Sequence, residues 1–308
     1  MAMNRYRLQS LGSFLSGAAG VTGWFARQSL AAYLELFKPR QTALLVATGV
    51  LGYLIASHGS FGTSLYLILL ALVLAVAGTT GLNMYFDREV DSAMFRTKRR
   101  PIPSGRVSSK AALLFSLPFL FGGITLAFSV NSLAGLFVAA GSFIDLALYT
   151  ILLKRKTALN IVVGSLAGGM PAVAGYAASA SRVDFLGFSL LLLVSLWSMA
   201  HIWLIASYYV EDYRRAGVPM LPVLHGIRKS VLSSLGILLA MNLTLSSLLL
   251  LHFVNFWPLL VSLLFSVPLS GVLIYYLRHG GRENLRRAYR ILSPYLLAIF
   301  LIVLLAGI

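Results

Sequence analysis

Residues 64–91 read SLYLILLALVLAVAGTTGLNMYFDREVD, an apolar run that leads into regularly spaced polar residues. The apolar part approaches the length of about 20 residues that an α-helix needs to cross the hydrocarbon core of a bilayer. Asn83, Asp87 and Asp91 follow at intervals of four, so on a continuing helix they lie on one face. The stretch therefore predicts a membrane helix that leaves the bilayer with three oxygen-bearing side chains on one side.

The rest of the chain repeats this apolar pattern. Of the 308 residues, 58% are hydrophobic and 11% are charged, whereas soluble domains carry about 25% charged residues. Nine segments are predicted to span the membrane: 42–56, 64–82, 111–128, 132–152, 159–178, 185–208, 231–251, 257–277 and 291–306. We therefore expect an all-α protein, a polytopic bundle of nine transmembrane helices that occupies residues 36–308.

Residues 1–35 are expected to precede this membrane domain as a cytoplasmic or interfacial segment. The segment begins with Arg5 and Arg7, and several glycines interrupt its modest apolar stretch. A cleaved signal peptide is the alternative interpretation of the same pattern.

The basic residues predict how the bundle is oriented. The formal net charge is +16, and 24 of the 25 lysines and arginines fall in the N-terminal segment or in alternate loops, with Arg182 as the exception. Because basic loops mark the cytoplasmic side, we expect a multi-pass protein of the cell inner (plasma) membrane, with its N-terminus in the cytoplasm and its C-terminus outside. In this setting the charge favours lipid headgroups or a phosphate-bearing substrate as partner, and not nucleic acid.

The segment that follows the second predicted span offers a metal site. Asn83, Asp87 and Asp91 present only oxygen ligands, and Mg²⁺ prefers one or two carboxylates together with substrate phosphate. Two carboxylates one helical turn apart repel each other, so a bound cation would explain their placement. A solvated helix face is the plainer alternative.

A basic run follows at once. Residues 96–106 read RTKRRPIPSGR, and Arg96, Arg99 and Arg100 are candidates to hold phosphate oxygens in bidentate hydrogen bonds. The orientation of basic loops toward the cytoplasm explains part of this run without any substrate. The order of acidic and then basic groups is nevertheless what a metal–diphosphate site requires.

Four further residues are candidates, and plainer alternatives exist for three of them. Glu211 and Asp212 form a second acidic cluster, of which at most one side chain should face the first, and charge balance for the two following arginines is the alternative. His201 lies within the sixth predicted span, where a packing role is commoner than a functional one. Asp145 lies within the fourth, where an ionisable group usually faces a cavity or a partner. The chain has no cysteine, which excludes thiolate sites.

Four motifs resemble the UbiA prenyltransferase superfamily and, within it, its haem-farnesylating branch. The first runs from Asn83 through Asp87 and Asp91 to the Arg-Pro-Ile-Pro-Ser-Gly stretch at 100–105, and the others lie at 36–42, 149–164 and 211–223. The superfamily's second Asp-x-x-x-Asp motif is reduced here to Glu-Asp, a reduction that the haem-farnesylating branch shares. Around His201 the branch usually has Gln, Pro and Phe, and this chain has Ser198, Ala200 and Ile202. The resemblance implies that these three positions lie at the pocket for the acceptor substrate.

The resemblance implies a membrane prenyltransferase that moves the farnesyl group of farnesyl diphosphate to a vinyl group of haem b, with Mg²⁺ as cofactor. The implied metal ligands are Asn83, Asp87, Asp91 and Asp212. The implied catalytic residues are these first three with Arg96, Arg100 and Lys154, and the implied substrate-binding residues are Arg99, Tyr149, Asp212, Glu211 and His201. The implied partners are both substrates, membrane lipids, and proteins of haem biosynthesis or a terminal oxidase.

Two other functions stay open on the sequence. One is a membrane prenyltransferase with another acceptor, such as a quinone precursor, a chlorophyll precursor or a glycerophosphate lipid. The other is a transporter, although transporters place charged sites near the bilayer midplane and often contain internal repeats. Here the acidic clusters are predicted at the cytoplasmic rim.

Overall fold

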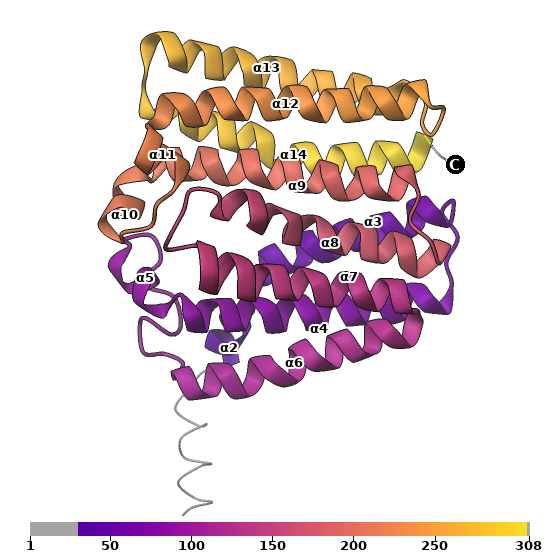
Figure 1. The fold of residues 1–308 in the computed structure, drawn as a ribbon, viewed down its shortest axis with the longest axis horizontal. Coiled ribbons are helices and arrows are strands. Elements are labelled where there is room, and N and C mark those ends of the chain that lie inside the picture. The colour runs from indigo at the N-terminus through magenta and orange to yellow at the C-terminus, as the bar shows by residue number, and fades with distance from the viewer. Residues whose placement is uncertain (1–29, 307–308) are drawn as a thin grey trace, which may run out of the picture.

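The computed structural model describes residues 30–306, in which all regular structure is helical. Its long helices are α3 (Pro39–Ala56), α4 (Thr63–Phe86), α6 (Ser109–Val130), α7 (Ser132–Phe143) continued by the π-helical η1 (Ile144–Leu153), α8 (Asn160–Ala180), α9 (Phe185–Tyr208), α12 (Ile227–Leu250), α13 (Trp257–His279) and α14 (Arg282–Ala306). The short helices are α2 (Leu30–Leu36), α5 (Arg88–Ala93), α10 (Val210–Arg215) and α11 (Leu221–His225). The long helices run side by side, and α5, α10 and α11 lie together at one end of them (Figure 1).

The predicted helical membrane bundle is confirmed, with one difference in a span. Among the described residues, 8 helices are long and apolar enough to cross a membrane when α7 and η1 are counted together. The first predicted span, 42–56, corresponds to α3, which is 18 residues long and carries the polar residues Arg40 and Gln41 in its first turn. This polar start leaves α3 short of a full apolar span, although it packs against α4 and α8 within the bundle. The N-terminal prediction for 1–29 lies outside the described residues.

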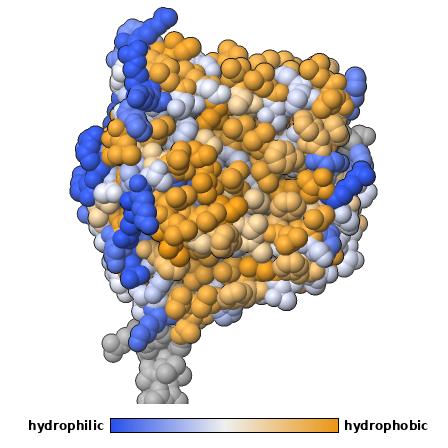
Figure 2. Space-filling view, viewed as in Figure 1, coloured by the Kyte–Doolittle hydropathy of each residue, from blue (hydrophilic) through white to orange (hydrophobic). Residues whose placement is uncertain are grey.

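An apolar belt surrounds the bundle between two polar ends. Figure 2 shows hydrophilic residues gathered along the end that carries α5, α10 and α11, with fewer at the opposite end and a broad apolar surface between. Large side chains such as Leu136, Leu239 and Leu264 are exposed in this belt. A helical bundle with its backbone hydrogen bonds satisfied internally and apolar side chains outward is suited to a bilayer.

Glycines allow α3 and α8 to approach closely. A Cβ atom added to Gly175 would lie 1.8 Å from the carbonyl oxygen of Gly49, and one added to Gly52 would lie 2.2 Å from that of Ala172. Small residues at helix crossings are a common packing device in membranes. This crossing fixes the position of α3, which lines the pocket described below.

The fourth predicted span contains a π-helical segment that the apolar pattern did not predict. η1 follows α7 directly, and at its end the N–H of Lys154 donates to the carbonyl of Tyr149, five residues earlier, at 2.8 Å. Such segments are rare and often lie at functional sites. In this protein η1 turns Asp145, Thr150 and Lys154 toward α4, where each contacts the first acidic motif.

Candidate active site

The first acidic motif forms one continuous helical face across the end of α4 and the start of α5. The N–H of Asp87 donates to the carbonyl of Asn83 at 2.9 Å, and the N–H of Asp91 donates to that of Asp87 at 2.8 Å. The three side chains therefore lie one above another, as their spacing predicts. Each is buried, with 8%, 4% and 3% exposure for Asn83, Asp87 and Asp91.

Each buried carboxylate of this face has a cationic partner from another segment. Lys154 Nζ lies 2.5 Å from Asp87 Oδ2, and Arg100 Nη1 donates to both oxygens of Asp91 at 2.8 Å. A buried charge is costly unless it is paired, so these contacts explain how the acids are tolerated. Burial acts to lower the pKa of Lys154, but Tyr149 and Asp87 outweigh it and raise that pKa above its ordinary value.

The amide of Asn83 is held at both ends by η1. Its Nδ2 donates to Asp145 Oδ2 at 3.0 Å, and its Oδ1 accepts from the hydroxyl of Thr150 at 3.0 Å. Asp145 therefore has a polar partner within the bundle, as expected for an ionisable residue at membrane depth. These contacts fix the orientation of the amide next to Asp87.

The second acidic cluster contributes one of its two carboxylates. Asp212 is 9% exposed, and its Oδ2 accepts from the backbone N–H of Arg96 at 3.1 Å, which joins α10 to the first motif. Glu211 is exposed and pairs with Arg214 instead. The prediction that at most one of these adjacent acids faces the first cluster is therefore confirmed. The structure places Asp212, and not Glu211, beside the site.

The remaining predicted residues near the rim take different positions. The Arg96 guanidinium donates to the hydroxyl of Tyr213 at 3.2 Å, so it does not pair with an acid of the first motif. Tyr149 lies under Lys154, whose Nζ is 5.2 Å from the ring centroid. Arg99 is exposed at the surface.

Lys38 belongs to the same charge network, although it is not among the residues predicted for the site. Its backbone is left-handed, with φ 45° and ψ 65°, and the turn is held where Thr42 and Thr80 donate to the carbonyl of Phe37 at 2.7 and 3.1 Å. Burial, and then the positive charge of Arg100, lowers the pKa of Lys38 to about 8. The only sequence signal is its place in the motif at 36–42, because neither a left-handed lysine nor its distant neighbours can be recognised from the chain.

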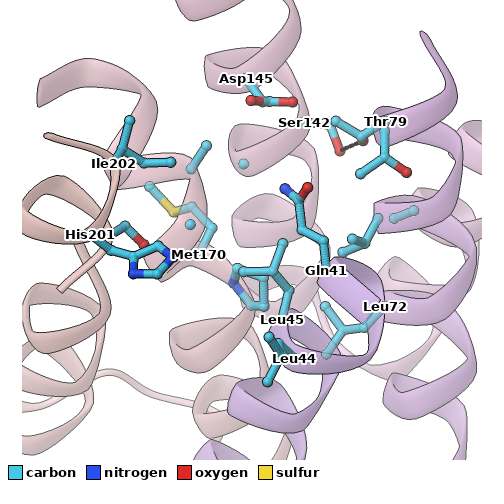
Figure 3. Close-up of a pocket in the computed structure, with 18 of the residues that line it drawn as sticks. Gln41, Leu44, Leu45, Leu72, Thr79, Ser142, Asp145, Met170, His201 and Ile202 are labelled. Atoms are coloured by element: carbon cyan, nitrogen blue, oxygen red, sulfur yellow. Dashed lines mark hydrogen bonds between the residues drawn. The ribbon is translucent and has the colours of Figure 1, made fainter. Parts of the chain in front are cut away.

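A pocket of about 430 Å³ begins beside this charge network and extends into the bundle (Figure 3). Arg96 lines it, and so do residues of α9 from Ile205 to Trp197, a length of about 12 Å along the helix. The imidazole of His201 points into this space in Figure 3 and stacks on Trp197 with ring centroids 4.7 Å apart. Among the described residues, His201 Nδ1 has no hydrogen-bond partner.

The donor atoms fit Mg²⁺ when substrate oxygens are included. Asn83, Asp87, Asp91 and Asp212 offer amide and carboxylate oxygens, which Mg²⁺ binds together with water and phosphate. Within residues 30–306, no group of three His, Asp or Glu side chains is arranged to hold a metal by itself. A metal at this face would therefore draw further ligands from Asn83, water and a phosphate-bearing substrate.

Taken together, the fold and the site define a polytopic membrane protein with a charge-balanced, oxygen-rich site at one rim and an apolar pocket beside it. The sequence model of the UbiA prenyltransferase family matches residues 45–305. The chain belongs to this family, as its motifs predict.

Curated relatives indicate which branch of the family this chain resembles. Over 210 residues the chain is 48% identical to a protoheme IX farnesyltransferase of Thermofilum pendens, which covers 68% of this chain and 74% of the relative. Over 279 residues it is 36% identical to a protoheme IX farnesyltransferase of Korarchaeum cryptofilum, with 89% and 93% coverage. The resemblance to the haem-farnesylating branch is therefore confirmed over most of the chain.

Solved structures share the fold. A digeranylgeranylglyceryl phosphate synthase superposes with a TM-score of 0.75 at 20% identity, over 90% of this chain and 98% of the other. A UbiA homolog from Archaeoglobus fulgidus bound to GPP and Mg²⁺ gives a TM-score of 0.62 at 17% identity, with 88% and 99% coverage. At these identities the likeness concerns the fold.

Proposed function

We propose that this protein transfers the farnesyl group of farnesyl diphosphate to a vinyl group of haem b and so forms haem O. The observation that carries the proposal is the stacked face of Asn83, Asp87 and Asp91 at the mouth of the pocket that contains His201. The face suits a diphosphate, and the pocket suits an apolar chain and a large acceptor. The names of the curated relatives support the same reaction.

We assign the metal to Asn83, Asp87 and Asp91, with Asp212 approaching from α10. Bound there, Mg²⁺ would act as a Lewis acid toward the leaving diphosphate. The fit rests on the oxygen-only donor set and on the burial of all three carboxylates. We assign Glu211, which is exposed, to contacts at the rim of the site and not to the metal.

The cations of the site are assigned to the diphosphate. Lys154 and Arg100 neutralise Asp87 and Asp91 in this structure. Their N–H donors therefore lie where the diphosphate oxygens must bind, and the same donors can exchange a carboxylate partner for a phosphate partner. Arg96 adds positive charge from the mouth of the pocket, while Tyr149 supports Lys154 through its ring. Donors placed before the reaction stabilise developing negative charge without reorganisation. Arg99 is assigned to the first, outer contact with this anion.

His201 is assigned to the acceptor. Its ring is directed into the pocket and held by stacking on Trp197, and a neutral imidazole nitrogen is a suitable ligand for haem iron. Contact at this position would place the porphyrin along α9, beside the apolar wall formed by Leu45, Leu72 and Met170. The bundle around the pocket excludes bulk water from the reacting carbon.

We propose that the rim with α5, α10 and α11 faces the cytoplasm. The basic residues concentrate in the loops of this rim, which follows the usual charge bias of membrane proteins. The protein would then lie in the cell inner (plasma) membrane with its N-terminus inside and its C-terminus outside. Farnesyl diphosphate would enter from the membrane with its diphosphate at the cytoplasmic rim, and haem-biosynthesis or terminal oxidase proteins would supply haem b or receive the product.

The test replaces one acid of the site and one acid outside it. Asp87→Asn removes a buried carboxylate, whereas Glu89→Gln alters an exposed one two residues away. In membranes supplied with farnesyl diphosphate, haem b and Mg²⁺, we expect Asp87→Asn to lower haem O formation by about 100-fold or more and Glu89→Gln to leave it within a few-fold.

Near-normal turnover by Asp87→Asn would refute the role assigned to this carboxylate. Release of diphosphate with a different prenylated product, and no haem O from the unaltered protein, would instead establish another acceptor.

A further inference from the structure

Four polar side chains gather on one wall of the otherwise apolar pocket. Gln41 from α3, Thr79 from α4, Ser142 from α7 and Asp145 from η1 line the same space (Figure 3), and we call them the polar cluster. Thr79 donates to Ser142 at 3.2 Å, and Ser142 donates to the carbonyl of Val138 at 3.0 Å. Within the described chain, the Gln41 amide and Asp145 Oδ1 have no hydrogen-bond partner, while Asp145 Oδ2 accepts from Asn83.

The polar cluster lies directly below the proposed diphosphate site. Thr79 precedes Asn83 by four residues on α4, so it lies on the same face and one turn, about 6 Å, deeper in the bundle. The carbon that leaves the diphosphate is bonded to one of its oxygens. A diphosphate held at Asp87 and Asn83 with its chain in the pocket therefore places this carbon beside the cluster.

The proposed reaction needs a water molecule at this position. When the allylic carbon bonds to the terminal carbon of the haem vinyl group, a positive charge forms on the vinyl carbon next to the porphyrin ring. Haem O carries a hydroxyl there, so a water oxygen must form a bond to that carbon and lose one proton. A prenyltransferase whose product forms by proton loss alone has no such requirement.

We propose that the polar cluster holds this water. The proposal rests on the proposed function. The water oxygen donates an electron pair to the vinyl carbon, its proton passes to an oxygen of the released diphosphate, and the proton leaves with that product. Diphosphate departs with the electron pair of the broken carbon–oxygen bond, so charge and atoms balance.

The geometry suits one ordered water molecule. A buried water needs two to four polar partners, and the Gln41 amide, the Thr79–Ser142 hydroxyls and Asp145 Oδ1 supply them on one wall. The apolar wall opposite would keep further water from the cation.

The experiment measures which product forms. Purified full-length protein in lipid nanodiscs receives farnesyl diphosphate, haem b and Mg²⁺, and the haem products are identified by mass spectrometry while diphosphate release is assayed separately. In Asp145→Asn and Gln41→Leu we expect diphosphate release to continue within about tenfold. Most of the farnesylated haem should then be lighter by one water, because the cation loses a proton and is not hydrated.

A control and a second variant keep the outcomes separate. Val76→Ala changes another residue of the pocket wall and should give only hydroxylated product. Fully hydroxylated product from Asp145→Asn and Gln41→Leu would overturn the proposal while leaving farnesyl transfer intact. If Asp145→Asn releases no diphosphate because Asn83 loses its hydrogen-bond partner, the product formed by Gln41→Leu tests the proposal by the same criterion. No farnesylated haem from the unaltered protein would instead contradict the proposed function.

Discussion

At the scale of single residues, the site consists of acids and bases that neutralise one another before any substrate arrives. Asp87 with Lys154, and Asp91 with Arg100, come from segments far apart in the chain. Their spacing along α4 and α5 could be predicted because helical geometry relates residues four apart. The cationic partners could not, because contacts across the bundle depend on how η1 and the loop after α5 return to this face.

Lys38 leads to a prediction about pH. Its pKa is lowered to about 8, so it loses its positive charge as pH rises through about 8, whereas an ordinary lysine stays charged to about 10.4. If Lys38 attracts the diphosphate, kcat/KM for farnesyl diphosphate should fall across this range, because kcat/KM reports groups of the free enzyme.

The matched variant is Lys38→Arg, which keeps its charge at all these pH values. We expect its kcat/KM, although lower overall, to stay level between pH 7 and 9, as measured by initial rates of diphosphate release. Lys110→Arg, at an exposed position, should leave the wild-type profile unchanged. A profile that falls equally in Lys38→Arg would assign the ionisation to another group.

At the scale of helices, close crossings hold the site together. A Cβ added to Gly123 on α6 would lie 2.3 Å from the backbone nitrogen of Ala75 on α4, whereas one added to the neighbouring Gly122 meets nothing within 4 Å. Gly123→Ala should therefore force α6 away from α4, at a cost of about 1–3 kcal/mol.

Gly122→Ala is the internal control, since it adds the same methyl group one residue away. We expect thermal unfolding in detergent to show a lower midpoint for Gly123→Ala and an unchanged or slightly higher one for Gly122→Ala, because alanine favours helix. Equal midpoints would show that the crossing of α4 and α6 has room for a side chain.

Which helices form could be predicted more fully than their details. The lengths of the apolar runs correctly predicted every long helix, since a helix that crosses a bilayer requires such a run. Only helix ends were predicted incorrectly; for example, α14 begins at Arg282 and not at 291. The π-helical register of η1 could not be predicted, because a sequence does not show which carbonyl accepts a hydrogen bond from a given N–H. For that reason the contacts of Asp145 and Thr150 with Asn83 could not be predicted either.

At the scale of the whole molecule, the two polar ends of the bundle are expected to lie on opposite sides of a membrane. Lys156, before α8, and Arg182, after it, are both exposed. The chain contains no cysteine, so Lys156→Cys and Arg182→Cys each introduce a single reactive thiol. In intact cells a membrane-impermeant maleimide should label Arg182→Cys alone, and Lys156→Cys should react only after the membrane is broken. The reverse pattern would invert the proposed orientation.

The most direct measurement is haem analysis of membranes from cells that make haem b and farnesyl diphosphate but have no haem farnesyltransferase of their own. With the unaltered protein we expect haem O in the extract by liquid chromatography and mass spectrometry. We expect none with Asp87→Asn present in the membrane at the same level. Absence of haem O despite inserted, folded protein, or equal amounts with both forms, would contradict farnesyl transfer at this acidic face.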